Sequence, residues 1–384
     1  MVTSLSFSVR IDDAMGIPIE GIPITFSPLQ ASGTVVPTTL TTAATGQVTV
    51  TWTLGETAGT QSVRVSAGAK SIVVEATATP GTPEAVLAFS GDTQTGVVGA
   101  RLPAPLVAQV QDRFGNGVPG VLVVFETETG SVSGLEATTD EAGRAQTGWT
   151  LGEQVGPQSL DAIAGADSVT FSATAEPGPP SSLTIVSGNG QVGQVGVALP
   201  EATVIDVRDE FANAATGASV TFSADGSVDP ASQTVDADGR VTVTWTLGTV
   251  SGDQVLTATA GAASVDVDAV AEPGPPALVE ALSGTGQQSY ATATLTEPLV
   301  VGVLDEFGNS VPDAEVSFVV LEGGGTVTPA AIASDVDGRA QTIWTLGVVI
   351  GTHALEARVE GAESGAFAAE GRLGSPGPAR RVQR

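Results

Sequence analysis

Four copies of one four-residue word, Trp-Thr-Leu-Gly, constrain the fold of this 384-residue chain more than any other feature. The words begin at the four tryptophans of the chain, Trp52, Trp149, Trp245 and Trp344, which are 97, 96 and 99 residues apart. A period of this length is the size of a domain, whereas solenoid repeats have periods of about 20–50 residues. The sequence therefore predicts four tandem domains of similar structure.

Apolar and polar residues alternate around each tryptophan. In the second repeat, Ala145, Thr147, Trp149 and Leu151 share one face of a predicted strand. This period of two is typical of a half-buried strand, so each tryptophan is predicted to be a core residue. Short β-branched segments between Gly, Asn and Asp turns complete the pattern of an all-β sandwich, the immunoglobulin-like architecture.

Proline-glycine pairs mark the predicted domain boundaries, and the same pair recurs at Pro376-Gly377. The predicted domains cover residues 1–79, 80–176, 177–272 and 273–372, and a basic tail rich in Pro and Gly covers 373–384. Linkers of so few residues leave little freedom between neighbours. Four tandem immunoglobulin-like β-sandwich domains are therefore expected to form an elongated rod.

The repeats resemble a known family. The second repeat reads LPAPLVAQVQDRFGNGVPGVLVVFE, then GSVS, then TTDEAGRAQTGWTLGEQVGPQSLDA. This order of turns, strands and glycines is similar to the bacterial Ig-like repeats of the invasin and intimin type, and the resemblance covers residues 1 to about 372. It implies tandem β-sandwiches, an extracellular or cell-surface location, and a role as stalk, adhesin shaft or fibre component.

Charge and composition narrow the classes of partner. The net charge is −28 and Lys70 is the single lysine, so nucleic acid and anionic membrane surfaces are not expected to bind. No apolar run reaches the ~18 residues that a membrane span needs. The chain has no cysteine and one histidine, His353. Triad catalysis and His- or Cys-based metal sites therefore lack their residues, and we predict a chain that is not an enzyme and has no cofactor.

His353 occupies the position at which the other repeats have a glutamine, just before an apolar strand. We expect it to be an exposed residue at the entry of that strand. The glutamines of the other repeats are Gln61, Gln158 and Gln254.

Two families of acidic turns are candidate sites. The Asp-x-Phe-Gly-Asn type occurs at Asp112–Asn116 and Asp305–Asn309, with a variant at Asp209–Asn213, and the first repeat has Ile17 in place of the asparagine. Asp and Asn side chains hydrogen-bond to nearby amides in turns, which explains these residues without a ligand.

The second family, Asp236–Gly239 and Asp335–Gly338, has the opening pattern of a calcium loop. No glutamate follows at the twelfth position, because Leu247 and Leu346 stand there. Asp-Gly is also a strong hairpin signal. We predict hairpin turns, with calcium binding as the alternative.

The two ends of the sequence differ from the other repeats. The first repeat lacks a segment equivalent to about Gly81–Pro105, which should contain the first strand. In the tail, basic residues follow the Pro376-Gly377 pair, at the place where the first strand begins in other repeats. The assembly residues are predicted to be Arg380, Arg381, Val382 and Arg384. One interpretation is donor-strand complementation, in which the tail of one copy completes the first domain of the next, head to tail. The alternative is that the sequence is a piece of a longer protein.

Three functions fit these observations. The first is a structural subunit or stalk of a bacterial surface fibre. The second is an adhesin shaft with one binding domain, although no repeat carries a distinct exposed patch. The third is an accessory region of a larger secreted carbohydrate-active protein. The sequence identifies no host or matrix ligand for any of them.

Overall fold

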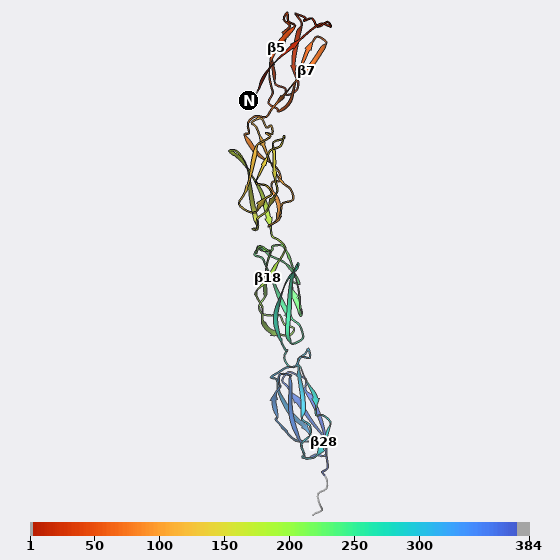
Figure 1. Cartoon of the computed structure of the whole chain (residues 1–384). Coiled ribbons are helices and arrows are strands. Elements are labelled where there is room, and N and C mark those ends of the chain that lie inside the picture. Colours follow the sequence, from red (N-terminus) through yellow and green to blue (C-terminus); the bar gives the residue numbers. More distant parts are fainter. Residues whose placement is uncertain (1–2, 375–384) are drawn as a thin grey trace, which may run out of the picture. The chain divides into compact units, whose positions relative to one another are not determined.

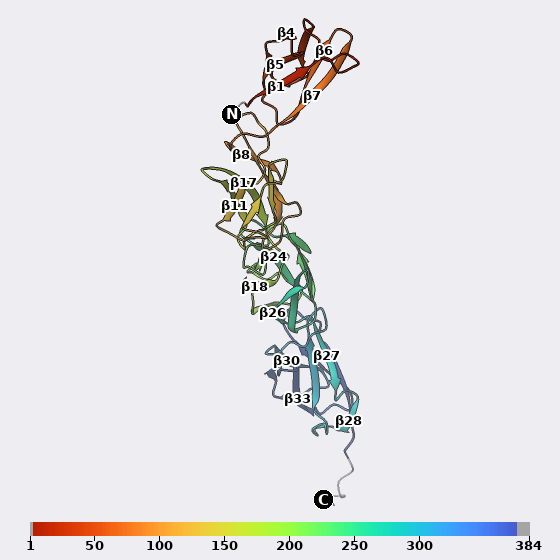
Figure 2. The same ribbon diagram turned by 45° about the horizontal axis from the view of Figure 1, so that its top comes forward.

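The computed structural model of the chain describes residues 3–374, and its regular elements are β-strands throughout. The chain divides between Gly178 and Pro179 into two compact units. Each unit contains two β-sandwiches (Figure 1, Figure 2), so the predicted all-β fold of four immunoglobulin-like domains is confirmed. Within residues 3–374 there is no helix that could cross a membrane.

The first domain has seven strands in two sheets. Their orders are β1-β5-β3 and β4-β2-β6-β7. The strands are β1 (Ser4–Arg10), β2 (Pro23–Pro28), β3 (Thr34–Val36), β4 (Thr39–Thr41), β5 (Gln47–Thr53), β6 (Gly59–Ala67) and β7 (Lys70–Ala78).

The second domain completes the first unit. Its sheets have the orders β14-β10-β8, β12-β15 and β13-β11-β16-β17-β9. The strands are β8 (Ala85–Ser90), β9 (Gln94–Val97), β10 (Leu106–Gln111), β11 (Leu122–Thr127), β12 (Ser131–Val132), β13 (Glu136–Thr138), β14 (Arg144–Thr147), β15 (Trp149–Thr150), β16 (Gly156–Ala164) and β17 (Asp167–Glu176).

The third domain pairs a four-stranded sheet, β18-β20-β24-β22, with a five-stranded sheet, β19-β26-β25-β21-β23. Its strands are β18 (Ser182–Ser187), β19 (Gln191–Gln194), β20 (Thr203–Arg208), β21 (Ser219–Ala224), β22 (Gly226–Asp229), β23 (Ser232–Thr234), β24 (Arg240–Leu247), β25 (Gly252–Ala260) and β26 (Ala263–Glu272).

The fourth domain repeats this topology with sheets β27-β29-β33-β31 and β28-β35-β34-β30-β32. Its strands are β27 (Leu278–Ser283), β28 (Gln287–Tyr290), β29 (Leu299–Leu304), β30 (Glu315–Glu322), β31 (Gly325–Thr328), β32 (Ala331–Ala333), β33 (Arg339–Leu346), β34 (Gly351–Arg358) and β35 (Gly365–Arg372).

Each tryptophan lies in the core of its domain, between the facing layers of the sandwich. In β24 the residues Val241, Val243, Trp245 and Leu247 are buried, while Arg240 and the threonines between them face outward or are half-buried. All four tryptophans are at most 1% exposed. The alternation read from the sequence therefore predicts the inward face correctly, because a strand places successive side chains on opposite sides of its sheet.

Among residues 3–79 there is no counterpart of two strands that each of the other three domains contains. β1 corresponds to β10, β20 and β29, since each of these pairs with the strand before or at the tryptophan word. In the later domains the other edge of that strand pairs with a first strand, β8, β18 or β27. The last strand there also pairs in parallel with β9, β19 or β28. Among residues 3–79 neither partner has a counterpart, so one edge of β1 and one edge of β7 have no strand partner in this range.

Candidate functional sites at the domain junctions and on the first sandwich

The turn Asp112–Asn116 is built around one buried carboxylate. Asp112 Oδ1 accepts hydrogen bonds from the amides of Phe114 and Asn116, both at 2.9 Å. This is the turn chemistry expected from the sequence. The second oxygen, Oδ2, accepts a hydrogen bond from the amide of Gly81 in the linker at 2.7 Å. One carboxylate therefore holds both the turn and the linker that enters the domain.

The Asn116 side chain connects this turn to the preceding domain. Its Oδ1 accepts a hydrogen bond from the amide of Ala58 at 2.8 Å, and its Nδ2 donates to the carbonyl oxygen of Glu56 at 2.7 Å. Glu56 and Ala58 belong to the loop that follows the first tryptophan word. We call the set of bonds made by the linker glycine, the aspartate and the asparagine the asparagine clamp.

The junction inside the second unit has the same clamp, atom for atom. Asp305 Oδ2 accepts from the amide of Gly274 at 2.9 Å. Asn309 Oδ1 accepts from the amide of Ser251 at 2.9 Å, and its Nδ2 donates to the carbonyl oxygen of Thr249 at 2.9 Å. Because all acceptors and donors on the preceding domain are backbone atoms, the clamp does not depend on the side chains of that loop.

The phenylalanine in the middle of each turn also meets the preceding domain. Phe114 lines a cavity of about 130 Å³ together with Leu54 and Gly55 of the first domain. In the second unit, a Cβ placed on Gly196 of the third domain would lie 3.3 Å from the ring of Phe307. The absence of a side chain at Gly196 therefore leaves room for this ring.

The clamp lowers the pKa of its aspartates. Burial by itself raises the pKa of the Asp112 carboxyl, but hydrogen bonds from the Asn116 side chain and from three backbone amides outweigh burial and lower the pKa to about 2. The pKa of Asp305 is lowered from its usual value by the balance of the same effects. Both carboxylates are therefore ionised at neutral pH, which is the form that accepts the linker amide.

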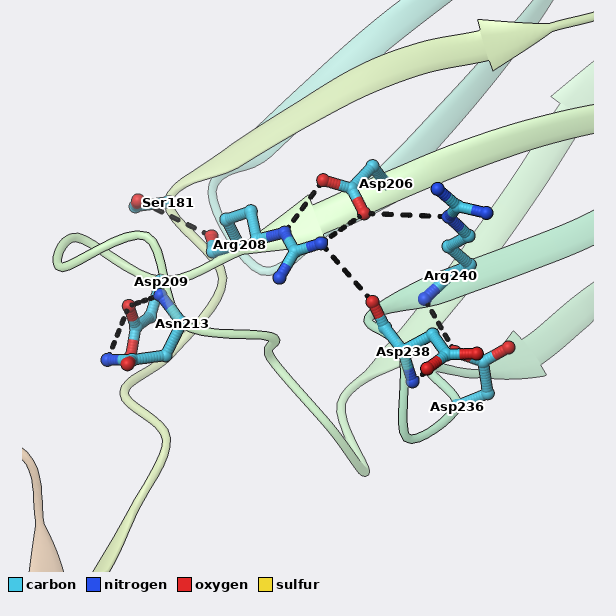
Figure 3. Close-up of polar contacts among 8 residues, drawn as sticks. All are labelled: Ser181, Asp206, Arg208, Asp209, Asn213, Asp236, Asp238 and Arg240. Carbon is cyan, nitrogen blue, oxygen red and sulfur yellow. Dashed lines mark hydrogen bonds and ion pairs between the residues drawn. The ribbon is translucent and has the colours of Figure 1, made fainter. Parts of the chain in front are cut away.

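The third domain has the corresponding turn directly after β20, shown in Figure 3. Asp209 Oδ1 accepts hydrogen bonds from the amides of Phe211 and Asn213, both at 2.9 Å, and Asn213 Nδ2 lies 3.0 Å from Asp209 Oδ2. The three turns therefore share one internal geometry. This agrees with the sequence pattern, in which all three retain the aspartate and the asparagine.

Charged side chains connect two hairpins beside this third turn (Figure 3). Arg208 makes a bidentate pair with Asp206, with Nε and Nη2 each 2.7 Å from a carboxylate oxygen. Arg208 Nη2 also donates to the carbonyl oxygen of Asp238 at 3.2 Å, and Arg240 Nε lies 4.0 Å from Asp206. These partly exposed groups bind each other, which favours a structural role for the cluster.

The Asp-x-Asp-Gly segments form hairpin turns of the same kind. Asp236 Oδ1 accepts the amides of Asp238 and Arg240 at 2.9 and 2.8 Å (Figure 3). Asp335 Oδ1 accepts the amides two and four residues later at 3.0 and 2.8 Å. Across residues 3–374, no three His, Asp or Glu side chains are grouped so that they could hold a metal ion.

The first domain has the turn without the clamp. Asp13 Oδ1 accepts the amides of Met15 and Ile17 at 2.8 and 2.9 Å. Met15 and Ile17 occupy the positions of the phenylalanine and the asparagine, and they are 88% and 58% exposed. Within the described residues, Asp13 Oδ2 makes no hydrogen bond. This turn therefore has the form of a junction turn but lacks the clamp's contacts among residues 3–374.

Two core positions on β7 of the first domain are more exposed than their counterparts in the second domain. By strand register, Val74 and Ala76 of β7 correspond to Phe171 and Ala173 of β17. The pair in the second domain is buried, whereas the pair in the first domain is half-buried. Phe7 of β1 is also half-buried, and its ring packs edge to face on Trp52 with centroids 6.2 Å apart. An apolar strip thus follows the unpaired edges of the first sandwich.

The expectation that His353 is exposed is wrong, because it is fully buried, at 0% exposure. It lies two residues before Leu355 on β34, so strand alternation turns both inward. In the first domain the equivalent Gln61 donates to the carbonyl oxygens of Gly55 and Thr57 and accepts from the Gly55 amide.

The histidine cannot reproduce these bonds. His353 Nδ1 lies 3.1 Å from the carbonyl oxygen of Gly351, while Nε2 has no hydrogen-bond partner among the described residues. In the first three domains a glutamine side chain hydrogen-bonds to the loop after the tryptophan word. The corresponding loop of the fourth domain has no such glutamine.

The predicted assembly residues Arg380, Arg381, Val382 and Arg384 lie outside the described residues, as does nearly all of the predicted tail. Sequence reasoning missed the asparagine clamp, because it explained the asparagine by turn chemistry alone. A signal was present: the turn has its asparagine in the three repeats that follow another repeat, and has Ile17 in the first.

No family model matches the chain. Solved structures to which it is similar include FdeC, an Escherichia coli adhesin, with 20% identity over 76% of this chain and 99% of that one and a TM-score of 0.40. Invasin, a bacterial integrin-binding protein, shows 15% identity over 96% of this chain and 76% of that one, with a TM-score of 0.42. An I-band fragment of titin shows 13% identity over 77% and 99%, with a TM-score of 0.38. Bacterial adhesin and invasin chains are thus among its similar structures, as the sequence resemblance predicts.

Proposed function

We propose that the chain is a non-enzymatic extracellular shaft of a bacterial surface structure, either a fibre subunit or the stalk of an adhesin. The observation that carries this proposal is the asparagine clamp, which joins two domains in the same way in both units. A protein that uses each junction only as a tether does not need such a contact. The bacterial surface location follows from the family resemblance of the repeats.

The clamp limits bending at the junction. Three hydrogen bonds hold each junction: the asparagine accepts one from the preceding loop and donates one to it, and the linker glycine donates one to the aspartate. Each contributes about 0.5–1.5 kcal/mol net, and the aspartate bond lies at the upper end because its acceptor is charged. Together they favour one junction geometry over splayed ones. The acidic surface, with a net charge of −28, keeps such shafts apart and soluble.

Within this proposal, copies join head to tail by donor-strand complementation. The tail of one copy, with Arg380, Arg381, Val382 and Arg384, adds a strand to the unpaired edge of β1 in the next. Two observations support this. Phe7 on β1 and Val74 on β7 are half-buried along the two unpaired edges, and an exposed sheet edge readily accepts an extended segment. The basic tail also complements an acidic chain.

Electron microscopy of the purified chain tests both parts. The Asn116→Ala/Asn309→Ala variant is expected to widen the distribution of angles at the first and third junctions. Asn189→Ala is the matched control, because Asn189 accepts a hydrogen bond from Asp268 inside the third domain. The wild-type chain is expected to form filaments, and deletion of residues 375–384 is expected to leave single shafts. Equal angle distributions in the clamp variant and the control would refute the shaft argument.

A further inference from the structure

The loop after the fourth tryptophan word is a junction loop without a partner in the structure. In the first and third domains, this loop presents the carbonyl oxygen of its first residue and the amide of its third to the clamp. The fourth domain has the same loop between Gly347 and Gly351. Within residues 3–374, Val348 O and Ile350 N, the equivalent backbone groups, make no hydrogen bond.

This loop is apolar in the fourth domain. It consists of Val348, Val349 and Ile350, all exposed, with Val348 at 80%. The loops that the two clamps bind are Glu56–Ala58 and Thr249–Ser251, which contain at most one large apolar residue. Three adjacent exposed apolar residues on one loop indicate a contact surface.

The strand register also places a linker glycine beside this loop. In the first unit the glycine that ends the loop, Gly59, pairs with Ala78, and Gly81 lies three residues after Ala78. In the second unit Gly252 pairs with Ala271, and Gly274 lies three residues after Ala271. In the fourth domain that partner is Gly371, so Gly374 takes the place of the linker glycine. We call Val348, Val349, Ile350, Leu373 and Gly374 the trailing face.

The turn Asp13–Ile17 of the first domain has the complementary features, and we call it the leading turn. Asp13 Oδ2, the atom that would accept a linker amide, has no hydrogen bond among residues 3–374. Met15 and Ile17 are apolar where the clamp turns have phenylalanine and asparagine. Within residues 3–374 this turn thus makes none of the asparagine-clamp contacts, and the trailing face has apolar residues where the internal junctions have a more polar loop.

We propose that the leading turn of one copy binds the trailing face of another, so that two chains complete a junction of the kind seen inside each unit. Met15 and Ile17 pack on Val348 and Ile350, and the amide of Gly374 donates to Asp13 Oδ2. This inference rests on the proposed self-assembly and names its second contact, which is separate from the donated strand. Apolar packing replaces the asparagine bonds of the internal junctions.

The contact is small, because one turn meets one loop. Stable protein interfaces bury roughly 1,200–2,000 Å², and a contact below this size is short-lived by itself. Covalent trapping is therefore the appropriate assay. The chain has no cysteine, so any introduced thiol is unique.

The experiment uses two single-cysteine versions of the full chain, Ile17→Cys and Val348→Cys, mixed in equal amounts under mild oxidation. The mixed disulfide dimer is expected to form at least tenfold faster than with the control pair, Ile17→Cys and Val336→Cys. Val336 is an apolar residue of the same fourth domain and is 89% exposed, but it lies on the Asp335–Gly338 turn. Adding Met15→Asp to the Ile17→Cys chain is expected to reduce the rate to that of the control.

Each outcome separates the two contacts. Equal rates for Val348→Cys and Val336→Cys would overturn the inference, and filaments that still form in that case would leave donor-strand assembly standing. Preferential trapping without filaments would support the end-face contact and reject the donated strand. Melting curves of each variant, matched to wild type, exclude unfolding as the cause of a changed rate.

Discussion

Replacing each core tryptophan by phenylalanine should destabilise two of the four domains more than the other two. All four indoles are buried to the same degree, at most 1% exposed. The indole Nε1 of Trp52 donates to the carbonyl oxygen of Ser32 at 2.6 Å, and that of Trp245 donates to Asp225 at 2.9 Å. The Nε1 atoms of Trp149 and Trp344 have no hydrogen-bond partner among the described residues.

The magnitude follows from this difference. Truncating the buried ring leaves a cavity in every domain, and this part of the loss is similar in all four. At Trp52 and Trp245 the variant also leaves a carbonyl oxygen without its donor, which costs about 1–3 kcal/mol. At Trp149 and Trp344 it removes a buried donor that has no acceptor, which offsets part of the cavity cost. Trp245→Phe should therefore destabilise its domain by about 2 kcal/mol more than Trp344→Phe destabilises its own.

Native-state hydrogen exchange measures the free energy of unfolding of each domain separately. The amides of β20 report on the third domain and those of β29 on the fourth. Trp→Ala at the same positions serves as the reference, with an expected loss of about 3–5 kcal/mol in each domain. If the two phenylalanine variants lost equal stability, the hydrogen bond to Asp225 would not contribute as argued.

Three further predictions concern the clamp, the loop of the fourth domain and the acidic turns. The pKa of Asp112 is about 2 in the folded protein and its usual value is 3.8, so its contribution to junction stability is present above about pH 4 and is lost as the pH falls toward 2. Nuclear magnetic resonance should find a titration midpoint for Asp112 near pH 2. A midpoint at the usual value of 3.8 would contradict the clamp. His353→Gln should raise the melting temperature of the fourth domain by adding hydrogen bonds to its loop of about 1 kcal/mol each, and a lower value in calorimetry would reject this. Calcium should leave the melting temperature unchanged, because the carboxylates of Asp236 and Asp335 accept hydrogen bonds from backbone amides. A rise of several degrees would instead show that these turns bind calcium.

The residues that predicted the fold are those whose role is local. The spacing of Trp52, Trp149 and the later tryptophans predicts the number of domains, and the period of two around them predicts which face is buried. Turn chemistry at Asp112 and Asp236 follows from side chain and backbone within five residues. His353 shows where this reasoning failed, because polarity suggested exposure although its position in the alternation placed it inward with Leu355.

The sequence by itself determined four repeated all-β domains, their inward-facing tryptophans, and a first repeat that lacks the segment containing the first strand. Only the tertiary structure decided what the asparagines of the turns do. Asn116 and Ala58 are 58 residues apart in the chain and meet because one domain ends where the next begins. The atoms that Asn116 binds belong to the backbone, which is the same for every residue type, so no pattern of side chains in the preceding loop could reveal the contact.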